Sequence, residues 1–165
     1  MPLDTNKFRE IINNREDPNK EVDSLFDGLL QDFKENIETS KYSEELQHLL
    51  EKLFTHFDKI PYTITLYISY SPDSRYWVVL NLYFDETRVL DSNLGEFGLT
   101  VENPENFSDF ANKAEQTLLD VFFVFDNYIK KNEGLKLSHN GIQIDSGTAL
   151  LWKKLSISGE IFLEN

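Results

Sequence analysis

The spacing of apolar residues predicts several helices. Apolar side chains recur at intervals of three and four residues over 22–38, 43–58 and 107–131, which is the pattern of a helix with one buried stripe. Ser43 is followed by two glutamates, so the second helix is expected to begin at a serine N-cap with acids in its first turn. A shorter helix is expected around residues 8–12, ending before a proline.

Between the second and third long helices the apolar period changes from 3.6 to two. Residues 62–70 and 75–84 alternate apolar with polar or aromatic side chains and are separated by a Ser-Pro-Asp-Ser turn. This pattern predicts two antiparallel strands. The shorter segments 87–90 and 97–102 predict a third and a fourth strand.

The C-terminal part of the chain is expected to add more strands. Asn140-Gly141 is typical of a tight hairpin turn, so segments 135–138 and 142–144 are predicted to pair with each other. Residues 150–163 are expected to provide one or two closing strands.

The order of these elements predicts an α+β fold. Helices come first, then an antiparallel meander, a long helix and further strands. We therefore expect a single domain, residues 1–165, in which N-terminal helices and one long central helix pack on a mainly antiparallel sheet of about five to six strands.

Charge restricts the possible partners. The chain has 29 acidic and 16 basic residues, a formal net charge of −13. Bare nucleic acid and anionic membranes are therefore disfavoured, and a basic protein partner is favoured. Residues 61–106 hold the densest excess, with seven acids and two bases.

Several chemistries lack the residues they need. The chain has no cysteine, so disulfides, thiolate nucleophiles and zinc–thiolate sites are excluded. His48 and His56 are too far apart for a helical metal pair, and His139 lies beside a turn. There is no phosphate-binding glycine loop and no nucleophile elbow. We expect a non-enzymatic protein without a cofactor.

Two patterns of acidic residues resemble metal sites but are incomplete. Asp91-x-Asn93 resembles the start of a calcium loop, but the required glycine falls one position early and the twelfth-position acid is missing. Asp85, Glu86 and Asp91 could meet as a magnesium cluster, although a solvated turn explains them better. We expect no bound metal.

The candidate binding surface is the second face of the first predicted hairpin. Tyr67, Trp77, Val79 and Tyr83 alternate away from the more apolar face, so they reach solvent if helices cover only one side of the sheet. Helices on both sides would instead make these rings part of the core. The acids that flank the rings in sequence are Asp73, Asp85, Glu86, Asp91, Glu96, Glu102 and Glu105.

These features favour a protein that binds and inhibits a basic protein partner. The first residues do not form a secretory signal, so we expect the protein to act in the cytoplasm. The leading hypothesis is a bacterial immunity protein that neutralises a cognate toxin. The alternatives are a phage-encoded acidic anti-restriction or anti-CRISPR inhibitor that mimics nucleic acid, and a small acidic secretion chaperone, whose element order is similar. Acids on the N-terminal helices are interleaved with bases, as in the i, i+4 spacing of Lys34 and Glu38, which argues against mimicry.

Overall fold

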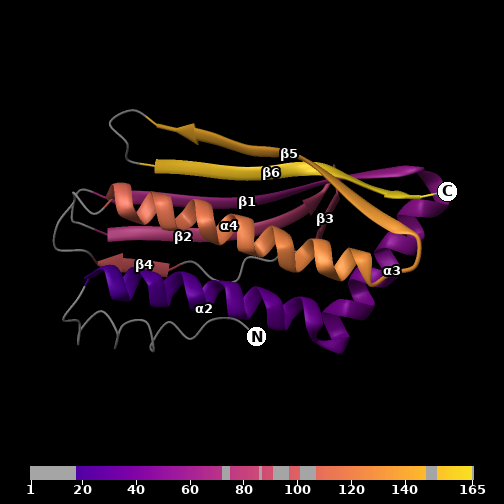
Figure 1. The fold of residues 1–165 in the computed structure, drawn as a ribbon, viewed down its shortest axis with the longest axis horizontal. Helices are drawn as coiled ribbons and strands as arrows, with labels where there is room; N and C mark the ends of the chain where they lie inside the picture. The colour runs from indigo at the N-terminus through magenta and orange to yellow at the C-terminus, as the bar shows by residue number, and fades with distance from the viewer. Residues whose placement is uncertain are drawn as a thin grey trace.

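The computed structural model describes residues 18–71, 75–85, 87–90, 97–100, 107–147 and 152–164 (Figure 1). The helices of this part of the chain are α2 (Pro18–Glu38), α3 (Ser40–His56) and α4 (Phe107–Lys130). Its strands are β1 (Lys59–Ser71), β2 (Arg75–Phe84), β3 (Thr87–Leu90), β4 (Phe97–Thr100), β5 (Leu135–Ser146) and β6 (Trp152–Leu163). The predicted α+β class is confirmed.

The strands form one antiparallel sheet in the order β3-β2-β1-β6-β5, with β4 also paired to β2. Strand β1 lies in the middle, between β2 and β6. The predicted pairing of residues 62–70 with 75–84 is confirmed, and its register places Tyr62 opposite Phe84 and Leu66 opposite Leu80.

The core lies between the sheet and the helices. Alternate residues of β1, such as Ile64 and Leu66, are fully buried, as are Leu80 and Leu82 on β2. Helix α4 lies along this face, α2 packs beside α4, and α3 contacts β1 and β3 (Figure 1). The period-two and period-3.6 stripes therefore meet in one hydrophobic layer.

The predicted N-cap of the second helix is wrong. Helix α3 begins at Ser40, with Thr39 in the extended N-cap position and no acid in the first turn. Thr39 alone separates α2 from α3, and its carbonyl accepts the Ser43 amide N–H at 2.9 Å. The Ser43 hydroxyl lies 3.4 Å from the Tyr128 hydroxyl instead of capping the helix.

The predicted hairpin at Asn140-Gly141 is also wrong. Strand β5 continues through this position, and both of its halves pair with β6, with a register shift between His139 and Ile142. Gly141 has a φ of +85°, and its amide N–H donates to His139 Nδ1 at 3.3 Å. The same left-handed glycine that suits a tight turn thus forms a β-bulge. The short helix expected around residues 8–12 lies outside the described residues.

Candidate functional site

The face of the sheet opposite the helices is called the open face below. Within the described residues, the three helices all pack on the other side. Cross-strand pairing places Tyr67 beside Val79 and Lys154, and Ser69 beside Trp77 and Trp152. The predicted binding residues Tyr67, Trp77 and Tyr83 therefore share one surface.

All three predicted rings are partly exposed. A fourth ring, Trp152 on β6, was not among the predicted site residues. Its indole stacks on Tyr67, with ring centroids 6.1 Å apart and an interplanar angle of 27°. Offset stacking of this kind is worth about 0.5 to 1.5 kcal/mol beyond area burial and holds both rings in place.

Gly147 explains where the Trp152 indole lies. The Gly147 amide N–H donates to the Trp152 carbonyl at 3.1 Å, which places these residues opposite each other at the end of β5 and β6. A side chain on Gly147 would overlap the indole ring. Because Gly147 has no side chain, the Trp152 indole can lie across the Gly147 backbone. Tyr67 of β1 stacks against the same indole.

The centre of the open face is partly shielded. Thr65 and Asn81 form a cross-strand pair there and are only 4% and 8% exposed. Tyr67 and Tyr83 lie two residues further along the same two strands and share this face. The open face therefore combines partly exposed rings with a buried polar pair.

The acids predicted to surround the rings are only partly described. Asp85 is exposed at the end of β2, and its amide N–H donates to the Pro61 carbonyl at 2.9 Å. The described open face also carries Lys154, which lies opposite Asp145. The other predicted acids lie outside the described residues: Asp73, Glu86, Asp91, Glu96, Glu102 and Glu105.

The histidines do not assemble a site. His48 and His56 are exposed on α3, and His48 Nδ1 lies 3.9 Å from the Glu51 carboxylate. The His139 ring packs edge-on against Phe122, with centroids 4.8 Å apart. Among the described residues, no cluster of three potential metal ligands occurs.

Tyr62 links the core to the bulged strand. Its hydroxyl donates a 2.8 Å hydrogen bond to the Ser138 carbonyl, next to the bulge. Burial, and then the negative charge of Asp126, raise the pKa of Tyr62 well above its ordinary value. The folded protein therefore keeps this phenol protonated in alkali in which the unfolded chain ionises it.

We expect Tyr62→Phe to make the protein less sensitive to alkali. Above about pH 10 the unfolded state loses the Tyr62 proton while the folded state retains it, so the parent loses stability as the pH rises. Urea unfolding at about pH 8 and about pH 11 should show a smaller fall for the variant. At neutral pH the variant should be less stable by about 1 kcal/mol because it lacks the hydrogen bond. Equal falls for both proteins would contradict this prediction.

No protein-family model matches the chain, and no curated protein matches its sequence significantly. In the described part of the chain, none of the helices has both the length and the hydropathy that a membrane span requires.

Proposed function

We propose that this chain is a non-enzymatic binding protein that inhibits a basic protein partner through the open face. In its specific form, the proposal is a bacterial immunity protein that neutralises a cognate toxin in the cytoplasm. The observation that carries it is the set of partly exposed rings, Tyr67, Trp77, Tyr83 and Trp152, on one face of a hydrogen-bonded sheet.

The rings are suited to binding because strand pairing fixes their backbone and stacking holds two of them together. Tyrosine and tryptophan bury a large area with few rotatable bonds, and they are enriched among the residues that dominate binding energy. Strand pairing fixes Trp77 opposite Ser69, and stacking fixes Tyr67 on Trp152. A partner would therefore pay little conformational entropy for ordering this surface.

Charge supports a basic partner. The net charge of −13 attracts a basic protein from a distance, and a toxin that cleaves nucleic acid needs a basic cleft for its own substrate. Attraction of this kind mainly raises the association rate, while contacts between the rings and the partner mainly set the dissociation rate. The two contributions can therefore be separated by kinetics.

The partner is identified by comparing two baits in the native host. The parent protein and Trp77→Ala are each used to capture proteins, and only proteins lost from the Trp77→Ala bait are pursued. The proposal expects a basic protein that inhibits growth when expressed alone and is neutralised by coexpression with the parent. A partner that depends on the protein for secretion would instead support a chaperone, and a host restriction or CRISPR nuclease would support an anti-defence inhibitor.

We expect Trp77→Ala to weaken binding to this partner by about 2 kcal/mol or more, mainly through faster dissociation. Biolayer interferometry measures both rate constants. Phe123→Ala is the matched control because Phe123 is 55% exposed on α4, on the helix side of the sheet. It should bind as the parent does.

Charge reversal completes this test. Asp85→Lys with Glu86→Lys should mainly slow association, and the difference from the parent should shrink as salt screens charges beyond about 8 to 10 Å. Circular dichroism checks that each variant is folded. Parent-like binding by both the Trp77 and the charge-reversed variants would place the interface elsewhere.

A further inference from the structure

Residues of α2 and α4 line a groove of about 670 Å³. Both helices lie on the side of the sheet opposite the open face (Figure 1). Each helix contributes a stripe of residues at spacings i, i+4 and i+7, so the groove follows about two helical turns, or roughly 10 Å. One stripe is Leu30, Lys34 and Ile37 on α2, and the other is Val124 and Tyr128 on α4 with Lys131 in the turn directly after it.

The groove has an apolar, well-supported floor. Ile37 is buried, and Leu30, Val124 and Tyr128 are half-buried, so apolar surface remains available to a ligand. The Tyr128 hydroxyl donates a 2.9 Å hydrogen bond to the Ser43 carbonyl of α3. This bond fixes the floor to a third helix.

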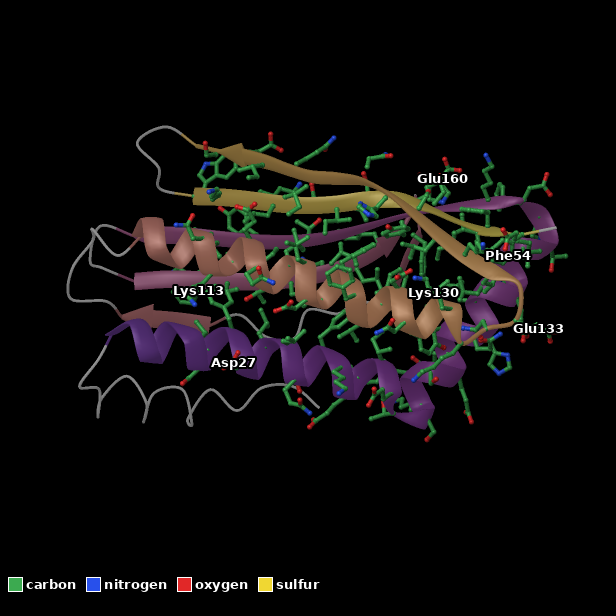
Figure 2. All side chains as sticks on the ribbon, viewed as in Figure 1. Asp27, Phe54, Lys113, Lys130, Glu133 and Glu160 are labelled. Atoms are coloured by element: carbon green, nitrogen blue, oxygen red, sulfur yellow. The ribbon has the colours of Figure 1, made fainter. Side chains whose placement is uncertain are left out.

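The charges along the groove are mostly positive, in contrast with the rest of this acidic chain. Its lining includes Lys34, Lys130 and Lys131 against one acid, Glu38. Lys130, labelled in Figure 2, is neutralised by Asp126, with a nitrogen–oxygen distance of 2.8 Å.

Lys34 and Lys131 remain as the two available cations, one on each wall. Among the described residues neither makes an ion pair, and the i, i+4 pair of Lys34 with Glu38 does not form. On the rim, Gln31 donates to the Glu35 carboxylate at 3.3 Å. A ligand that lies along the floor therefore passes between two ammonium groups.

We propose that the groove between α2 and α4 binds an acidic amphipathic helix from a protein partner. The apolar stripe of that helix packs on Leu30, Val124 and Tyr128, and carboxylates on its two flanks meet Lys34 and Lys131. Two packed helices with matched stripes offer the ridge-and-groove surface that a third helix fills. At physiological salt, screening weakens the repulsion between the acidic helix and distant acids of this chain. The attraction of the helix to the nearby Lys34 and Lys131 is therefore the larger effect.

The test uses two designed 21-residue peptides, with leucines on one helical face and either glutamate or lysine at the remaining positions. Chemical-shift mapping on the isotopically labelled protein should place the glutamate peptide on residues 30–38 and 124–131. The double variant Lys34→Glu with Lys131→Glu should bind the glutamate peptide about 10-fold or more weakly. It should also gain affinity for the lysine peptide.

Two controls make the result decisive. Lys52 is exposed on α3 and does not line the groove. Lys52→Glu therefore changes the net charge of the protein but should leave the affinity for the glutamate peptide close to that of the parent. Oleate, added below its aggregation concentration, tests for a fatty-acid site. The proposal fails if the glutamate peptide does not bind, if it binds outside the groove, if the charge swap has no effect, or if oleate alone occupies the groove.

Discussion

Replacing Phe125 with alanine is expected to lower the free energy of unfolding by about 3 to 5 kcal/mol, the range for removing a large ring from a packed core. Phe125 is fully buried on α4. Its ring lies 5.4 Å from that of Tyr62 on β1 and 6.1 Å from that of Phe84 on β2, measured between centroids. The substitution removes the ring contacts that join α4 to β1 and β2 and leaves a cavity between the helix and the sheet.

Urea unfolding monitored by circular dichroism measures this loss. Phe123→Ala is the matched control, because it removes the same ring from the same helix at a position that is 55% exposed. Its cost should be about 1 kcal/mol or less, because it loses only its exposed ring and the edge contact with Phe122. Phe125→Leu should give an intermediate loss if alanine leaves the protein too unstable to measure. Similar losses at positions 123 and 125 would contradict the observed packing.

Strand positions in the first hairpin were predictable because one face is strongly buried. Ile64 and Leu66 are fully buried, while Thr63 and Tyr67 point to the other side. Shifting the register by one residue would move all the apolar side chains of a strand into solvent, so the pattern defines the pairing. The long helical stripes were predictable for the same reason.

Local signals failed where the neighbouring helix or strand decides the structure. Ser43 has the chemistry of an N-cap, but the single-residue link at Thr39 starts α3 three residues earlier. Asn140-Gly141 has the chemistry of a turn, but β6 is long enough to pair with both sides of it. The pairing of β6 with both halves of β5 joins two separate strands, so the residues around Gly141 alone do not indicate it.

The candidate site was predictable only within the hairpin. Tyr67, Trp77 and Tyr83 lie on two strands joined by a short turn, so alternation alone places them on one face. Trp152 stacks on Tyr67 because β6 pairs with β1, and no spacing in the sequence indicates that pairing. Alternation within 152–163 could have placed Trp152 on the same face as Lys154, but not next to Tyr67. The α2–α4 groove likewise depends on packing between distant segments.

Replacing Gly159 with alanine is expected to destabilise the protein by about 3 kcal/mol or more, because an added methyl group has no space. Gly159 lies on β6 between Tyr62 of β1 and His139 of β5. A Cβ atom there would overlap the Ser138 carbonyl oxygen and crowd the His139 backbone. These are main-chain atoms in a bulged strand, so they cannot turn aside as the end of a flexible side chain would.

The same substitution should break a second interaction. The Ser138 carbonyl accepts the hydrogen bond from the Tyr62 hydroxyl, so moving β5 away from Gly159 also separates Ser138 from Tyr62. Hydrogen exchange should therefore accelerate along β5 in Gly159→Ala, while β1 and β2 remain protected. Gly141→Ala is the control, because Gly141 has open space around its α-carbon and only its φ of +85° disfavours a side chain. Its cost should be about 1 kcal/mol. If Gly159→Ala proved as mild as Gly141→Ala, β5 could not pass as close to β6 at the bulge as the structure shows.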